Sequence, residues 1–348
     1  MKSPLSPIKS VCLYSRRFLP PLWLALLVLL PATWAAKDGS GFAGVEFLGS
    51  AQLSRLEIEK FLALKPGATA ENAQKALVRL KAKLDFKHIK TNIDFVPGDN
   101  NNFFLVVDVV ESGLTNTLPT RKLANPHHVF LTNEKPFTLL EQLRVRQDKL
   151  IEEGRPTDET YSQGMKVFQD PPSQRIAEQE IKELAGQQRA LLTLIATDPN
   201  PNRRAAAIEL LNFTPEWLPS CVSLIAAIDD SDTQVRAAAT KFIWARLANF
   251  PDDFPFQDLL EALSRQLCRP SYSDRSKSLA CLIALCKRDS DSITAVKEFD
   301  QSKLKQISES TILPDIQVMA TQLMKVAANP PAIKRRLPGR TTDSGSGF

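Results

Sequence analysis

The sequence predicts an α+β N-terminal domain of order β-α-α-β-β, followed by an all-α superhelical solenoid of about four helix pairs. Apolar and polar residues alternate over residues 43–48 and 89–95, and a nearly continuous apolar run covers residues 103–110; both patterns are typical of strands. Apolar stripes at helical spacing then fill residues 173–329. Within that second region a motif recurs after 32 residues, which indicates stacked helix pairs.

The first 36 residues have the three parts of a secretory signal peptide. A basic region ends at Arg16-Arg17, an apolar run covers residues 22–30, and Ala36 closes a small-residue cleavage site. Nine apolar residues are fewer than the roughly 20 that a membrane-spanning helix needs. We therefore expect an exported, periplasmic protein with cleavage at Ala36, and an uncleaved anchor is the alternative.

The net charge of +5 resides at the two ends of the chain. Without residues 1–36 and 332–348, the body holds 36 basic and 38 acidic side chains. A body so close to neutral argues against nucleic acid as a partner. Residues 330–348 form a basic, Ser/Gly-containing tail that we expect to be disordered. Peripheral contact of this tail with anionic lipid head groups is a weaker hypothesis.

Residues 40–112 are expected to form a small domain of their own. A strand pattern covers residues 43–48, and Ser54 with Glu57 has the spacing of a capping box that opens a helix. A second helix begins near Thr69 and carries an apolar stripe. The two strands that complete the domain cover residues 89–95 and 103–110.

Three segments of this domain carry a family pattern: Val45-Glu46-Phe47-Leu48-Gly49, Leu64-Lys65-Pro66-Gly67 and Val107-Asp108-Val109-Val110-Glu111. Together with the order of elements, they resemble a polypeptide-transport-associated (POTRA) domain. The resemblance implies binding of other chains through an edge of the sheet, where an extended peptide satisfies unpaired backbone groups. The alternative is an edge covered by the rest of this protein.

Residues 113–172 are expected to be a linker with helices. We predict a helix from Phe137 to Glu153, a short helix from Thr157 to Phe168, and a break at Pro171-Pro172. His127-His128 lacks Cys, Asp or Glu neighbours at the spacing of metal ligands, so we assign no metal site there.

The recurring motif places Asp198 six positions before Arg204 and Asp230 six positions before Arg236, with three alanines after each arginine. A degenerate third copy begins at Asp274. These units resemble HEAT repeats, a family of armadillo-like helical arrays. The resemblance implies a ladder of charge-assisted hydrogen bonds between neighbouring repeats, and alanines that let helices approach closely. We therefore interpret the four residues as structural.

Four cysteines remain after the signal peptide: Cys221, Cys268, Cys281 and Cys286. They allow three complete pairings. Cys281 and Cys286 lie about 140° apart around a straight helix, which disfavours a bond between them. We interpret the four as small buried hydrophobic residues, and a structural disulfide stays open because an exported protein meets an oxidising compartment.

The sequence shows none of the common enzyme signatures: no Gly-x-Ser-x-Gly elbow, no phosphate-binding glycine loop and no His-Glu-x-x-His. With three histidines in the chain, we predict no catalytic, cofactor or metal site. The predicted function is an exported, non-enzymatic protein–protein interaction scaffold of the bacterial cell envelope. It would bind protein partners through the POTRA-like sheet edge and the helical repeat surface. The alternatives are an accessory component of an outer-membrane or secretion assembly, and a HEAT-repeat lyase or base-excision-type enzyme.

Overall fold

The computed structural model describes residues 41–49, 53–86, 90–98, 102–110, 120–123, 125–153, 155, 159–162, 164–288 and 301–328. All of these residues belong to one compact unit. The expected signal peptide with Ala36, and the expected basic tail, lie outside the described residues. Within the described part, no helix is long and apolar enough to cross a membrane.

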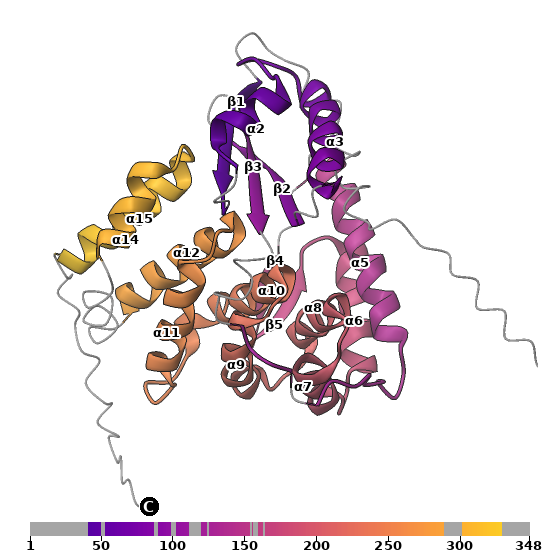
Figure 1. Ribbon diagram of the computed structural model, residues 1–348. Helices are drawn as coiled ribbons and strands as arrows, with labels where there is room; N and C mark the ends of the chain where they lie inside the picture. Colours follow the sequence, from indigo (N-terminus) through magenta and orange to yellow (C-terminus); the bar gives the residue numbers. More distant parts are fainter. Residues whose placement is uncertain are drawn as a thin grey trace, which may run out of the picture. The chain divides into compact units, whose positions relative to one another are not determined.

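The N-terminal part is an α+β domain built around a three-stranded mixed sheet (Figure 1). The sheet has the order β1-β3-β2, in which β1 runs parallel to β3 and β2 runs antiparallel to it. The parallel pair requires a crossover, which the two helices after β1 supply. The elements are β1 (Phe42–Leu48), α2 (Arg55–Leu62), α3 (Ala70–Phe86), β2 (Lys90–Pro97) and β3 (Phe103–Val110).

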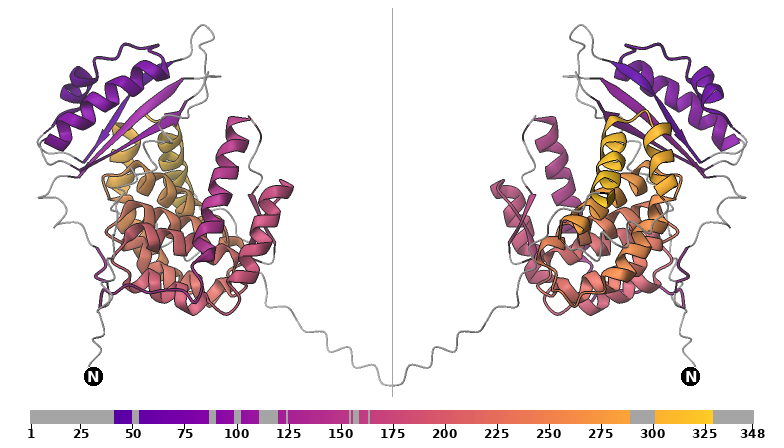
Figure 2. Two further views of the ribbon diagram at one scale, coloured as in Figure 1. Left: turned by 90° about the vertical axis from the view of Figure 1, so that its right-hand side faces the viewer. Right: turned by 90° about the vertical axis from the view of Figure 1, so that its left-hand side faces the viewer.

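Helices α2 and α3 cover one face of this sheet (Figure 2). Helix α2 begins with the expected capping box, in which the Ser54 side chain accepts from the Glu57 backbone and Glu57 bonds back to Ser54. The odd-numbered residues of β3 point into this core because side chains alternate along a strand. The buried members from the two helices are Ile58, Leu62, Ala73, Ala76, Leu77, Leu80 and Leu84.

The second face of the sheet packs against the helical region instead of facing water. Val96 of β2 and Val106 of β3 are buried in the core of that region, and Phe104 packs against it. These three residues have the opposite parity to those that face α2 and α3, as the pleat requires. The sheet is therefore buried on both faces, and only its edges can meet another chain.

The C-terminal part is helical, and consecutive helices pack in pairs: α7 with α8, α9 with α10, α11 with α12, and α14 with α15 (Figures 1 and 2). The second helices of successive pairs, α8, α10, α12 and α15, also contact one another in order. The bounds are α5 (Lys135–Glu152), α6 (Pro171–Glu183), α7 (Gln188–Thr197), α8 (Pro201–Leu210), α9 (Trp217–Ile225), α10 (Thr233–Trp244), α11 (Phe256–Leu267), α12 (Tyr272–Arg288), α14 (Gln301–Ser310) and α15 (Pro314–Ala328).

The short helix predicted from Thr157 to Phe168 is wrong. The segment forms an antiparallel hairpin, β4 (Glu159–Ser162) and β5 (Met165–Phe168). Gly164 has φ +80°, a left-handed conformation that suits the turn, and the flanking residues include β-branched and aromatic side chains. The expected break at Pro171-Pro172 is instead the first turn of α6, where proline costs no hydrogen bond.

The four cysteines in the described part form no disulfide bond. Cys221, Cys281 and Cys286 are buried, whereas Cys268 is exposed, so the interpretation of all four as buried residues is wrong for Cys268. Cys281 and Cys286 both lie on α12, where each packs into the helical core.

Candidate binding surface

The four motif residues of the sequence belong to a buried ladder between successive helix pairs. The Arg204 guanidinium donates to both carboxylate oxygens of Asp230, at 2.7 and 3.1 Å, and to the backbone carbonyl of Asp198 at 2.8 Å. Arg236 repeats the pattern one pair further on, with Asp274 and with the carbonyl of Asp230. Each arginine therefore bonds a backbone carbonyl just before its own helix and the aspartate carboxylate of the following helix pair.

This ladder has no access to a ligand. Arg204 is 2% exposed, and Asp198, Asp230 and Asp274 are fully buried. Burial by itself would raise the pKa of Asp230, but the hydrogen bonds from Arg204 and Arg121 outweigh it and lower that pKa. The charges of Asp230 and Asp274 are thus balanced by arginines that also hydrogen-bond them, as a structural role requires.

Residues 120–123 and 125–134, which precede α5, run along the same edge of the helical pairs, and we call them the strap. The Arg121 backbone donates to the Asp229 carbonyl, and its guanidinium bonds Asp230 and the Ile195 carbonyl. Further along, the His127 backbone donates to the Thr197 carbonyl at 3.1 Å. The strap covers this edge with the protein's own chain, so the edge is not available to a partner.

The adjacent histidines of the strap do not form a metal centre in the part of the chain that is described. His128 Nδ1 lies 3.5 Å from the Asp198 carboxylate, and His127 bonds the Asn125 carbonyl. The described residues contain no group of three His, Cys, Asp or Glu side chains that could hold a metal ion.

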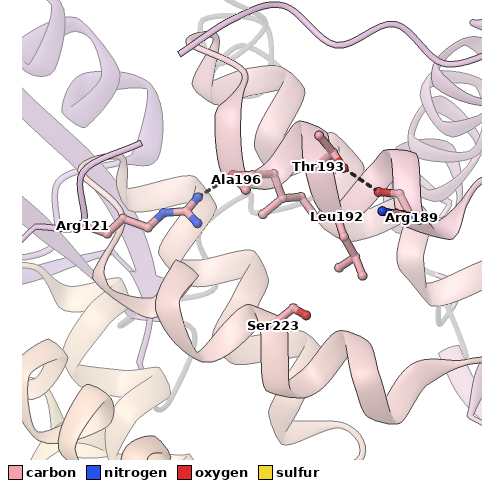
Figure 3. Close-up of a pocket in the computed structure, with 7 residues that line it drawn as sticks. Arg121, Arg189, Leu192, Thr193, Ala196 and Ser223 are labelled. Carbon is pink, nitrogen blue, oxygen red and sulfur yellow. Dashed lines mark hydrogen bonds between the residues drawn. The ribbon is translucent and has the colours of Figure 1, made fainter. Parts of the chain in front are cut away.

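A shallow hollow of about 330 Å³ lies between α7 and α9 (Figure 3). The Arg121 guanidinium at its rim is engaged by the contacts described above, and the Thr193 hydroxyl donates to the Arg189 carbonyl. No carboxylate, histidine or cysteine is among its lining residues, so it brings no general acid or base together. The lining residues are Arg121, Arg189, Leu192, Thr193, Ile195, Ala196 and Ser223.

Two buried carboxylates fasten the sheet to the helical region. Asp108 of β3 accepts hydrogen bonds from the Tyr272 backbone, the first residue of α12, and the shorter one is 3.0 Å. Glu46 of β1 accepts from the Ile312 backbone at 3.0 Å, two residues before α15. Burial raises the pKa of Asp108 to about 7. These contacts place the β1 side of the sheet against the ends of α12 and α15.

The β1 edge is contacted by other segments of the chain. Phe42 exchanges backbone hydrogen bonds with Gly67 and Ala68, and a Cβ built on Gly44 would lie 3.0 Å from the Ile312 side chain. Four of the seven residues of β1 are buried. The outward backbone groups of Phe42 are therefore already occupied, and the segment around Ile312 packs beside Gly44 and Glu46.

The β2 edge differs, and its free backbone groups can be identified from the register. The Gly98 N–H donates to the Asn102 carbonyl. The backbone N–H and C=O groups of the even-numbered residues of β2 therefore point toward β3, and those of the odd-numbered residues point away from it. Thr91, Ile93 and Phe95 thus direct their N–H and C=O groups away from the sheet. Within the described ranges nothing bonds these groups. Pro97 ends the row, because it has no N–H.

A row of polar side chains leads from this edge across the helical region. Asn92 donates to Asp94 at 2.7 Å on β2, and Lys277 of α12 is an electrostatic neighbour of Asp94. Lys241 of α10 follows, and its ammonium lies 3.4 Å from Glu159 of the hairpin. We name Asp94, Lys277, Lys241 and Glu159 the polar row; with the β2 edge it forms the candidate binding surface.

No family model, no curated protein and no solved structure matched this chain in the three comparisons.

The motif residues predicted from the sequence are brought together by the fold. The sequence also led us to expect binding at a sheet edge, but it did not identify β2 as that edge or name the residues of the polar row. Asp198, Arg204, Asp230 and Arg236 form one ladder. One signal for the junction was present in the sequence: Asp108 interrupts an otherwise apolar strand. Lys277 and Lys241 carried no signal, because single lysines on helices are ordinarily solvated surface residues.

Proposed function

We propose that this protein is an exported, non-enzymatic scaffold that captures an extended segment of another protein as a fourth strand beside β2. The observation that carries the proposal is the β2 edge, whose outward backbone groups bond nothing in the described part of the chain. Thr91, Ile93 and Phe95 offer a row of outward N–H and C=O groups that an incoming strand can satisfy.

The two sides of the sheet support this assignment of the edge. α2 and α3 pack on one face, and the helical region packs on the other. Asp108 and Glu46 hold the sheet to the ends of two helices, so the β2 edge stands on a fixed support. A preorganised edge binds with less loss of conformational entropy than a mobile one.

The finer architecture belongs to the same proposal. The order and topology of the sheet support a POTRA-like domain. The paired helices, with arginine–aspartate bonds between successive pairs, support a HEAT-like superhelical array. In such an array each pair is stabilised by its neighbours, so the helical part serves as the rigid base of the scaffold.

Export is tested separately from binding. Cell fractionation with N-terminal sequencing of the mature chain should give a start near Lys37 in a soluble envelope fraction. A chain that keeps Met1 and stays in the cytoplasm would contradict the export part of the proposal.

Strand capture is tested by a matched pair of variants at Thr91. Thr91→Pro removes an outward N–H that bonds nothing in the described chain, so the sheet itself keeps its ladder. Thr91→Val keeps that N–H and removes a buried hydroxyl that has no hydrogen-bond partner. Proteins that co-purify with the wild type should remain with T91V and be lost with T91P. Retention of every partner by a folded T91P variant would refute capture at this edge.

A further inference from the structure

A strand added to β2 would meet side chains on both of its faces. It would follow the pleat of β2, so its side chains would alternate between the face toward α3 and the face toward α12. The even-numbered residues of β2, such as Asp94, mark the α12 face, and Ile93 and Phe95 mark the α3 face. The chemistry of the two flanks therefore restricts the sequence of the added strand.

On the α12 face, the ammonium group of Lys277 makes fewer hydrogen bonds in the described structure than it has donors. Its ammonium group has three N–H donors, and in the described structure it makes one hydrogen bond, to Ser273 Oγ at 2.7 Å. Burial lowers the pKa of Lys277, and the nearby Asp274 and Asp94 act against that shift. Asp274 is already engaged by Arg236, so it cannot serve Lys277 as a dedicated partner.

Lys241 adds a second ammonium on the same side. It is more than half exposed, and its described ion pair with Glu159 is long, at 3.4 Å. Lys241 also lowers the pKa of Lys277, which indicates that the two ammonium groups repel each other. A carboxylate that arrives beside Lys277 relieves this repulsion and supplies the missing acceptor.

On the α3 face, the β2 edge presents apolar side chains of its own strand. Ile93 and Phe95 are partly buried and pack against the core beneath α2 and α3. Residues of an added strand that lie on this face would be cross-strand neighbours of these two side chains, and such neighbours are favoured when they are apolar.

We infer that the strand captured at the β2 edge is amphipathic, with a carboxylate toward α12 that pairs with Lys277 and apolar side chains toward α3 that pack beside Ile93 and Phe95. This partner assignment rests on the strand capture proposed above. An ammonium that gains a carboxylate in a partly buried site should favour an acidic over a basic strand by at least about tenfold in affinity.

The test uses two synthetic, fluorescently labelled seven-residue peptides and the full-length protein. One peptide alternates valine with glutamate, and the other alternates valine with lysine. Fluorescence anisotropy should show that the glutamate peptide binds at least tenfold more tightly. Lys277→Met should remove most of this preference, Lys241→Met should reduce it less, and T91P should abolish the binding of both peptides.

The possible outcomes separate this inference from the proposed function. Equal binding of both peptides that is lost in T91P overturns the carboxylate assignment and leaves strand capture standing. A glutamate preference that persists in K277M also overturns the assignment to Lys277. Binding that a folded T91P variant retains, or no binding of either peptide, counts against both. Circular dichroism checks that each variant is folded, and Lys277→Gln replaces K277M if the apolar substitution disturbs α12.

Discussion

Arg236 donates to both carboxylate oxygens of Asp274, 38 positions later in the chain, as Arg204 does to Asp230 in the preceding helix pair. The third aspartate thus ends the ladder, although its own copy of the motif has no arginine six positions on. Gln266 takes part at this end, because its amide donates to Asp274 at 3.0 Å and its carbonyl accepts from Thr240 and Ser278.

Removing the last aspartate should destabilise the helical part strongly. Asp274→Ala leaves the Arg236 guanidinium buried without its carboxylate, which costs about 3–5 kcal/mol in comparable buried pairs. The measurement is the free energy of unfolding from urea denaturation followed by circular dichroism. The matched control is Asp258→Ala, an exposed aspartate of α11, for which we expect a change of about 0.5 kcal/mol or less. Similar values for the two variants would refute the ladder's contribution to stability.

The part of the fold that the sequence predicts is the part with local signals. The alternating strands, the capping box at Ser54 and the repeated Asp–Arg spacing each depend on residues close in the chain. The hairpin at 159–168 was missed, because its four-residue strands are too short for a distinct period.

The polar row of the candidate surface was not predicted, and the reason differs from that for the hairpin. It joins β2 to α12 and α10, so it depends on the docking of the sheet onto the helices. That docking uses Asp108 and Glu46, whose partners are backbone groups 164 and 266 positions away. Almost every residue has a backbone N–H, so the residue types in the sequence do not indicate which N–H a carboxylate will bind.

The junction between the sheet and α12 should weaken as the pH rises. Burial raises the pKa of Asp108 to about 7, from 3.8 in an unfolded chain. The folded state therefore binds this proton more tightly. The contribution of this bound proton to the free energy of unfolding is full below about pH 4 and is lost as the pH rises to about 7. Asp108→Asn removes this titration and keeps an acceptor for the Tyr272 N–H.

The measurable quantity is the difference in free energy of unfolding between D108N and the wild type as a function of pH. We expect this difference to shift in favour of D108N between about pH 4 and pH 7, by roughly 3 kcal/mol. Taking the difference cancels the titration of other carboxylates except those coupled to Asp108, which are Asp94 and Asp274. A difference that does not change with pH would contradict the assignment.

A buried glutamate on α6 is expected to destabilise the fold. Within the described residues, both carboxylate oxygens of Glu180 lack a hydrogen-bond partner, and burial together with the charge of Glu183 raises its pKa to about 8. Glu180→Met should stabilise the protein by about 1–3 kcal/mol at pH 9, because it removes an unsatisfied buried group. The gain should shrink toward pH 5, where the carboxyl is neutral in the folded state. Thermal unfolding at both pH values measures this, and the exposed Glu178→Met should show no comparable gain.

The thiols should differ in reactivity according to burial. Cys268 is exposed, whereas Cys221 and Cys281 are buried and their pKa values are raised by burial to about 12. Thiolate, and not thiol, is the reactive form, so alkylation should be confined to Cys268 in the native protein. Iodoacetamide labelling at pH 8 followed by peptide mass mapping tests this, with a sample unfolded in guanidinium as the control in which all four are labelled. If labelling still skips some of the four in guanidinium and reaches them after reduction, those cysteines are disulfide-bonded in the purified protein, which contradicts the structure. If Cys281 is labelled as fast as Cys268 under native conditions, α12 does not remain packed in the helical core.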